Sequence, residues 1–155
     1  MHFDEKADLP CCSTPWGRWW QTVDEVHVEV QLQHASTAQH VNCNITVHRL
    51  TCIVAGAVII DGALFEAVRA DDSTWTLEEG KLIRMLLCKA HPGADRIWSS
   101  LLKDCAQTFP LHPLLLDATQ KSLTLERFHR QHPGMDFSNA EITGNYGGGG
   151  PTTNL

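Results

Sequence analysis

The chain has 155 residues, of which 43% are hydrophobic and 19% charged, and its formal net charge is −6. This length supports one domain with a proper core, and no apolar run is long enough to span a bilayer. The negative charge and the scattered lysines and arginines argue against nucleic acid as a partner, because nucleic-acid binders concentrate positive charge on one face. The opening MHFDEKADLP lacks the features of a secretory signal, so we expect a cytoplasmic or nuclear protein without a membrane partner.

The clearest strand pattern follows an acidic N-terminus, residues 1–12, that we expect to be flexible. Residues 26–32 alternate strictly between apolar and polar side chains, which is typical of a half-buried strand. One face carries Val26, Val28, Val30 and Leu32, and the other carries His27, Glu29, Gln31 and Gln33. The polar stretch HASTAQH that comes next is predicted to be a loop.

Further strands are predicted over residues 41–47 and 50–54, with Gly56 marking a turn or a bulge. Asp61-Gly62 and Glu79-Gly80 lie between apolar runs, and Asp-Gly is typical of a two-residue hairpin. These signals give about seven short strands before residue 88, with no helical pattern between them. The pattern indicates an antiparallel β-sandwich.

The pattern changes after Lys89. Residues 96–105 are predicted to form either a short helix or a final strand. From Leu114 to about His132 the polarity is helical, and an apolar stripe is expected on Leu114, Ala118, Leu125 and Phe128. Pro133-Gly134 ends this helix, and the tail with its four consecutive glycines is expected to be mostly flexible.

The predicted fold is therefore an all-β antiparallel sandwich of about seven to eight strands with an appended C-terminal α-helix. The sandwich is assigned to residues 13–104 and the helix with the ending that follows it to residues 110–142. Residues 143–155 form the flexible Gly-rich tail.

Three tryptophans crowd the start of the sandwich, at positions 16, 19 and 20. Each is either a core residue or an exposed anchor for a partner. Continuous alternation puts Trp20 on the side of Val26 and Trp19 on the other, unless a turn near Val23 and Asp24 reverses the order. We expect at least one of Trp16 and Trp19 to be packed, and we expect Trp75 to be buried.

The sequence contains six cysteines and nine histidines, but their spacing indicates no catalytic or metal-binding motif. None of the six cysteines forms a C-x-x-C pair, and we expect thiols. His129 and His132 are three apart on the predicted helix but lack an evident third metal ligand. The acidic pairs Asp71-Asp72 and Glu78-Glu79 lie next to predicted turns, which account for them without a role in acid–base catalysis. We therefore expect no catalytic residue, no cofactor and no metal; the alternative is a small His/Cys-dependent hydrolase or metal-binding enzyme.

The stretch TPWGRWWQTVDEVHVEV resembles the opening of the CS domain in the NudC family. Three groups of residues carry the resemblance over nearly the whole chain. The opening supplies Trp19, Gln21, Thr22 and Val26. The Gly-x-Leu, Ser-x-Trp and closing Leu-x-Lys motifs correspond to Gly62, Leu64, Trp75, Leu77, Glu78, Lys81 and Lys89. The ending corresponds to Phe128, Pro133, Met135, Asp136, Phe137, Ser138 and Ala140.

This resemblance implies a CS-domain sandwich in a non-enzymatic co-chaperone or adaptor that binds heat-shock protein 90. It also implies a role in stabilising the lissencephaly protein, a WD-repeat regulator of dynein, or another β-propeller client. The implied location is the cytoplasm, with association with centrosomes, spindle poles and kinetochores. The segment 33–58 departs from relatives, which are often more basic there, because it carries only Arg49.

Two sets of residues follow from this interpretation. Met135 and Phe137 either form a docking element or fold back on the sandwich, and pairing of the helix with its copy in a homodimer is a further possibility. The predicted partner-binding residues are Trp16, Trp20, Arg49, Lys81, Lys89, Met135 and Phe137. The predicted structural residues are Trp19, Gln21, Thr22, Gly62, Trp75 and Phe128.

Overall fold

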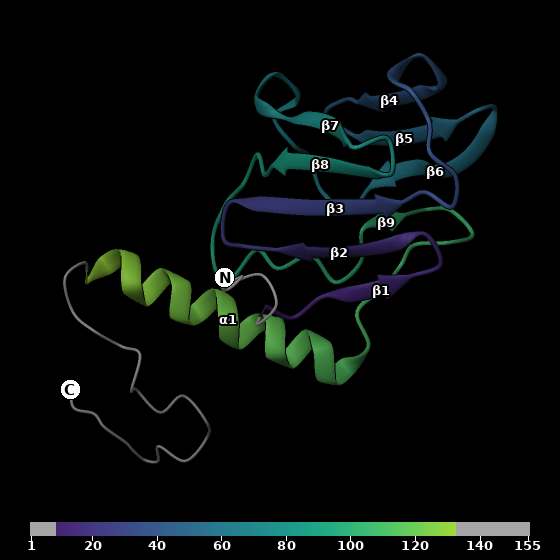
Figure 1. The fold of residues 1–155 in the computed structure, drawn as a ribbon. Helices are drawn as coiled ribbons and strands as arrows, with labels where there is room; N and C mark the ends of the chain where they lie inside the picture. Colours follow the sequence, from purple (N-terminus) through teal and green to yellow (C-terminus); the bar gives the residue numbers. More distant parts are fainter. Residues whose placement is uncertain (1–8, 133–155) are drawn as a thin grey trace.

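The computed structural model describes residues 9–132, which form two antiparallel β-sheets and one α-helix (Figure 1). The first sheet, sheet A, has the order β1 (Cys12–Thr14), β2 (Gly17–Gln21), β3 (Glu25–Gln31), β8 (Leu82–Cys88) and β7 (Thr74–Glu78). The second, sheet B, has the order β4 (Val41–Ile45), β5 (Arg49–Val54), β6 (Ala57–Leu64) and β9 (Leu102–Lys103). The helix α1 spans Pro113–Gln131, and the short 3₁₀ helices η2 and η3 span Ala38–His40 and Ala70–Asp72.

The predicted sandwich with an appended helix is confirmed. Residues 9–132 contain nine strands rather than the expected seven to eight. The strands β1 and β9 have three and two residues, too few for an alternation to be visible in the sequence. The predicted N-terminal segment lies mostly in residues 1–8, and the predicted end signal, ending motif and tail lie in residues 133–155, outside the described part of the chain.

The core lies between the two sheets and follows the period of two. In β3 the side chains of Val26, Val28 and Val30 are fully buried, as the alternation predicted. They pack in one cluster with Leu50 and Cys52 from β5 in the opposite sheet. Burial of these inward faces supplies the main stabilising term of such a sandwich.

The predicted Asp61-Gly62 hairpin is wrong, because both residues lie inside β6. The chain reverses instead at Ala55 and Gly56, whose φ angles of 50° and 82° are those that a two-residue hairpin of type I′ needs. Gly62 has a packing role: a Cβ there would come within 3.0 Å of both Leu102 and Cys105. The Glu79-Gly80 turn between β7 and β8 is confirmed, with φ angles of 53° and 71°.

The helix begins and ends close to its predicted limits. Pro113 occupies the first turn, and the Nδ1 atom of His112 accepts a hydrogen bond of 3.3 Å from the Leu115 N–H. In the segment before it, only Leu102 and Lys103 are in a strand, although Trp98 and Leu101 are buried. No helix among residues 9–132 is long and apolar enough to cross a membrane.

The helix packs with a different face from the predicted stripe. Leu114 is 80% exposed and Phe128 is 39% exposed, whereas Thr119 and Leu123 are buried. Leu123 packs with Val23 from the turn between β2 and β3 and with Ala94 from the loop after β8. The helix consequently lies beside the end of the sandwich at which these two segments meet (Figure 1).

Candidate functional site

A row of alternating charges crosses the outer face of sheet A. The register places Arg18 of β2 opposite Glu29 of β3, and Glu29 opposite Arg84 of β8. The Glu29 carboxylate pairs with Arg18 at 2.8 Å and with Arg84 at 2.8 Å, and Arg84 also pairs with Glu78 of β7 at 2.9 Å. Only 8% of the Glu29 side chain is exposed, so the two guanidinium groups compensate a largely desolvated carboxylate.

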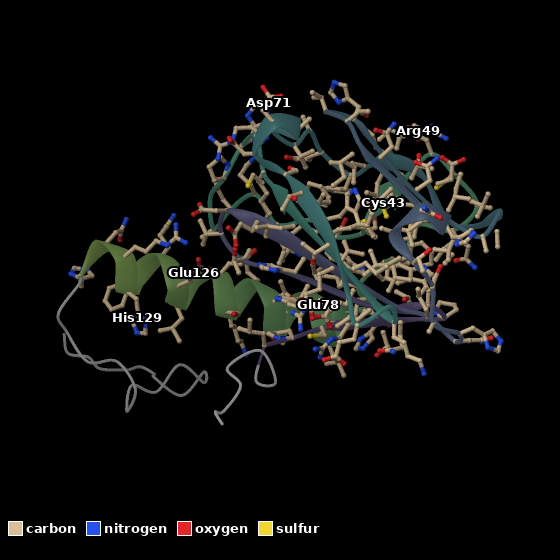
Figure 2. The ribbon with its side chains drawn as sticks, turned by 45° about the horizontal axis from the view of Figure 1, so that its top comes forward. Cys43, Arg49, Asp71, Glu78, Glu126 and His129 are labelled. Carbon is tan, nitrogen blue, oxygen red and sulfur yellow. The ribbon has the colours of Figure 1, made fainter. Side chains whose placement is uncertain are left out.

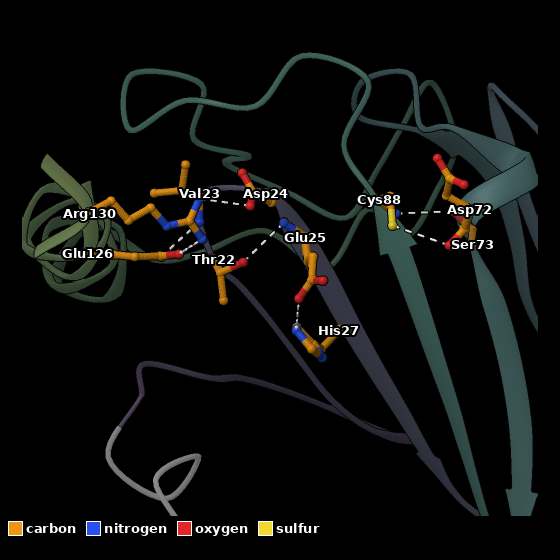
Figure 3. A network of polar contacts seen from close by, with 10 residues as sticks. All are labelled: Thr22, Val23, Asp24, Glu25, His27, Asp72, Ser73, Cys88, Glu126 and Arg130. Carbon is orange, nitrogen blue, oxygen red and sulfur yellow. Dashed lines mark hydrogen bonds and ion pairs between the residues drawn. The ribbon is translucent and has the colours of Figure 1, made fainter. Parts of the chain in front are cut away.

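An aromatic pair lies beside this row. The rings of Trp20 and His27 stack with centroids 5.0 Å apart and an angle of 2° between their planes. The Arg18 guanidinium lies over the same indole, 5.0 Å from its centroid, in cation–π geometry. His27 Nε2 also approaches the Glu25 carboxylate at 3.1 Å, as Figure 3 shows.

The row and the aromatic pair border a hollow of about 260 Å³ on this face. Its outer rim is β7, an edge strand of sheet A, which contributes the exposed residues Thr74 and Thr76. The lining combines aromatic, aliphatic, hydroxyl and paired ionic groups, a mixture that suits a protein partner. Side chains that line it include Trp20, His27, Glu29, Thr76, Arg84 and Leu86.

Of the predicted partner-binding residues, Lys89 requires correction. Only 1% of Lys89 is exposed, and its Nζ donates to Gln21 Oε1 at 3.0 Å and to the Arg96 carbonyl at 3.4 Å. Desolvation lowers the pKa of Lys89 to about 8, although the carboxylates of Glu126, Glu66 and Asp24 oppose the shift. Lys89 is therefore an interior group that holds the loop after β8 and has no exposed surface for a partner.

Trp20 requires a similar correction. It was predicted as a partner-binding residue, but it is 2% exposed beside His27 and Arg18 and contributes only to the wall of the hollow. Trp16 is half-buried and meets the Phe109 ring edge-on at 5.2 Å. Met135 and Phe137 lie outside the described residues.

The two remaining candidates are exposed and lie on different parts of the surface. Lys81 follows the turn between β7 and β8. Arg49 lies on the outer face of sheet B, where it pairs with Asp61 of β6 at 2.8 Å. Figure 2 shows Arg49 and Glu78 on well-separated parts of the sandwich. The members of the predicted set that lie within residues 9–132 do not form one continuous surface.

Several predicted structural residues have a clear role. Trp19 is fully buried and its indole N–H donates to the Phe109 carbonyl at 3.0 Å, so one of Trp16 and Trp19 is packed as expected. Gln21 accepts from the Trp98 N–H at 2.8 Å and donates to the Trp98 carbonyl at 2.9 Å. Thr22 closes the turn between β2 and β3 by accepting from the Glu25 N–H at 3.0 Å. Strict alternation would place Trp19 and Val26 on opposite faces, but this turn allows both side chains to be buried.

Two other structural predictions change. Trp75 is half-buried on an edge strand and packs on the margin of the core, although burial was expected. Phe128 lies on the outer side of α1, where its ring centroid is 4.5 Å from that of His132. The charged row formed by Arg18, Glu29 and Arg84 was missed, because pairing between strands far apart in sequence is needed to see it.

The cysteines and histidines are the side chains on which the alternative of an enzyme or metal-binding protein rests. Among residues 9–132, no group of three or more His, Cys, Asp or Glu side chains is placed to hold a metal. Burial raises the pKa of the Cys11, Cys12 and Cys88 thiols, which makes them poorer nucleophiles. The sulfur atoms of Cys43 and Cys52 are in contact, 3.5 Å apart.

Comparison with known proteins shows that this chain contains a CS domain, because a family model of that domain matches residues 15–89. The matched residues include the whole lining of the hollow. The chain is 42% identical to the NudC domain-containing protein 2 of both Rattus norvegicus and Homo sapiens over 149 residues. That match covers 96% of this chain and 93% of each relative. The chain belongs to the NudC family.

The chain is also similar to a more distant relative and to two solved structures. The Dictyostelium discoideum nuclear movement protein nudC is 26% identical, covering 80% of this chain and 91% of the relative. The crystal structure of Mus musculus NudC domain-containing protein 2 is 39% identical, with a TM-score of 0.48 over 86% of this chain and all of that chain. The solution structure of the CS domain of human KIAA1068 protein is 19% identical, covering 61% of this chain and 77% of that chain, with a TM-score of 0.50.

Proposed function

We propose that this chain is a non-enzymatic co-chaperone or adaptor that binds heat-shock protein 90 and presents a client protein to it. Membership of the NudC family and the CS domain supports a chaperone-related binding role. The single structural observation that carries the proposal is the hollow on the outer face of sheet A. It supplies a lined, recessed surface next to an edge strand, to which a partner segment can also add backbone hydrogen bonds.

The charged row gives this surface a fixed shape. Arg18 and Arg84 are held in place by Glu29, so a partner meets donors that have already lost much of their rotational freedom. The stacked rings of Trp20 and His27 are similarly fixed. Such preorganisation raises affinity without new contacts, which suits a small binding module.

A charge inserted into the hollow tests the location of the interface. Thr76 is exposed on β7 at the rim, and Thr76→Lys adds a long cationic side chain next to Arg84. The matched control is Asn44→Lys, which adds the same side chain to an exposed position of β4, the edge strand of sheet B. Calorimetric titration of purified heat-shock protein 90, with and without nucleotide, measures both variants.

We expect Thr76→Lys to weaken binding about tenfold or more, a loss of about 1.4 kcal/mol, and Asn44→Lys to bind like the unaltered chain. Equal binding by both variants would remove the sheet A face from the proposal. Failure of the unaltered chain to bind the chaperone would remove the co-chaperone role itself.

The client and the cellular location belong to the same proposal. The proposed client is a WD-repeat regulator of dynein, the lissencephaly protein, and the proposed locations are the cytoplasm, centrosomes, spindle poles and kinetochores. Depletion of the protein should lower the steady-state level of this client, and Thr76→Lys should restore it less well than Asn44→Lys. An unchanged client level after depletion would contradict this part.

A further inference from the structure

Two thiols from neighbouring strands of sheet B lie in contact. The register of β4 and β5 places Cys43 directly opposite Cys52, and their sulfur atoms are 3.5 Å apart. Both cysteines are free thiols, and an S–H···S hydrogen bond joins them. The other described cysteines contact backbone oxygens, for example Cys88 at the Asp72 carbonyl and Cys105 at the Gln107 carbonyl.

The position of the pair within the ladder suits a covalent bond. The Thr46 N–H donates to the Arg49 carbonyl, and the Ala55 N–H donates to the His40 carbonyl. Because hydrogen-bonded and non-hydrogen-bonded pairs alternate along an antiparallel ladder, Cys43 and Cys52 occupy a non-hydrogen-bonded position. Opposed Cα atoms at such a position are about 4.5 Å apart, within the range that a disulfide spans.

The two thiols differ in access. Cys43 lies on the edge strand β4 and is partly exposed, whereas Cys52 lies on the inner strand β5 and is fully buried. Figure 2 shows Cys43 on the sheet B side of the sandwich. A solvent oxidant therefore reaches Cys43 first, and the adjacent Cys52 is placed to react with the product.

We propose that Cys43 and Cys52 form an oxidisable dithiol site that peroxide converts to a cross-strand disulfide. The Cys43 thiolate attacks one oxygen of hydrogen peroxide, the O–O bond breaks, and hydroxide leaves and is protonated to water. The Cys52 sulfur then attacks the sulfur of the Cys43 sulfenic acid, so that the S–S bond forms and the S–O bond breaks. The Cys52 proton leaves with that hydroxyl group as a second water, and the two thiols have together lost two electrons to the peroxide.

The electrostatics support this order of events. The hydrogen bond between the two thiols lowers the pKa of Cys43 and raises the pKa of Cys52, which burial raises further. Cys43 is consequently the thiol with the greater thiolate population, and thiolate character governs the rate of attack on an oxidant. Burial raises the pKa of Cys11, Cys12 and Cys88, which makes them slower competitors.

The sequence provides a direct test in the full chain. Trypsin cleaves after Arg49, between the two cysteines, and places Cys43 in peptide 19–49 and Cys52 in peptide 50–69, each as the only cysteine of its peptide. After brief exposure of the native protein to hydrogen peroxide and alkylation of the remaining thiols, we expect mass spectrometry to find these two peptides linked. Dithiothreitol should separate them again.

Matched variants assign the two roles. Cys52→Ala should abolish the linked peptide and leave a sulfenic acid on Cys43 that dimedone captures, whereas Cys105→Ala should leave the yield of linked peptide unchanged. Preferential linkage of any other cysteine pair in the unaltered protein would overturn the proposal. Oxidation of Cys43 to a sulfinic acid without linkage would overturn it as well, and neither of these results depends on whether a variant folds.

Discussion

The Glu126 carboxylate accepts a 2.9 Å hydrogen bond from the backbone N–H of Val23, which lies 103 residues earlier in the chain. The same carboxylate pairs with Arg130 one helical turn later, and Arg130 also pairs with Asp24 at 2.8 Å (Figure 3). Figure 2 shows Glu126 on the side of α1 that faces the sandwich and His129 on the other side. These contacts fix the helix to the turn between β2 and β3.

Glu126→Ala should weaken the docking of α1. The substitution removes the acceptor of the Val23 N–H and one partner of Arg130, and loss of a hydrogen bond to a charged group costs about 1.5–3 kcal/mol. We expect a decrease of that size in the free energy of unfolding, together with faster hydrogen exchange at Val23 and along the helix. Urea denaturation and exchange measured by NMR provide the two readouts.

Asp117→Ala is the matched control on the same helix. Asp117 is exposed and, within residues 9–132, pairs with Lys121 at 3.2 Å, so its loss should cost less than about 0.5 kcal/mol. If both substitutions had the same small effect, the docking contact would contribute nothing measurable.

This contact also explains why the packed face of α1 could not be predicted. The sequence pattern of Leu114, Leu125 and Phe128 indicates a conventional apolar stripe. The observed face instead combines the buried Leu123 and the partly buried Leu115 with polar side chains. The partners of these polar side chains are in distant loops; Gln120, for example, donates to the Ala94 carbonyl at 2.9 Å. Helix length and limits follow from local signals, whereas this choice of face depends on tertiary contacts.

The candidate surface likewise combines features that local sequence predicts with features that depend on tertiary contacts. The alternation in residues 26–32 was sufficient to predict which side of β3 is buried, and the CS-domain resemblance was sufficient for the architecture. The hollow depends on the pairing of β3 with β8, whose residues are more than 50 positions apart. Only that register brings Glu29 between Arg18 and Arg84.

Lys89 should give the protein an unusual pH dependence. Its pKa falls from 10.5 in the unfolded chain to about 8 in the folded protein. Between these values the unfolded chain binds more protons than the folded one, so the contribution of Lys89 to stability rises with pH from about 8 to about 10.5. The difference of pKa corresponds to a gain of about 3 kcal/mol at most.

Comparison with Lys89→Met isolates this contribution from the titration of cysteines and other groups. We expect the free energy of unfolding of the unaltered protein to rise relative to the variant between about pH 8 and about pH 10.5, measured by urea denaturation across that range. Parallel pH profiles for the two proteins would show that the Lys89 pKa is not lowered.

Gly62→Ala tests the corrected position of the hairpin. An added Cβ would lie 3.0 Å from Leu102 and from Cys105, so we expect a loss of about 1–3 kcal/mol from overpacking. Removal of the Cys105 side chain beyond Cβ should offset part of this loss, which makes the effects of Gly62→Ala and Cys105→Ala non-additive in a double-mutant cycle. Strict additivity in thermal or urea unfolding would contradict this packing role.

Glu29→Gln should cost more stability than the corresponding change on the opposite sheet. The substitution removes the charge between Arg18 and Arg84 from a side chain that is only 8% exposed, and we expect a loss of about 1–3 kcal/mol. Asp61→Asn is the control, because Asp61 faces Arg49 at 2.8 Å with 42% of its side chain exposed, and solvent limits such a pair to about 1 kcal/mol or less. High salt should reduce the smaller loss and leave most of the larger one, since burial protects an ion pair from screening. Equal losses with equal salt dependence in urea denaturation would show that Glu29 is as well solvated as Asp61.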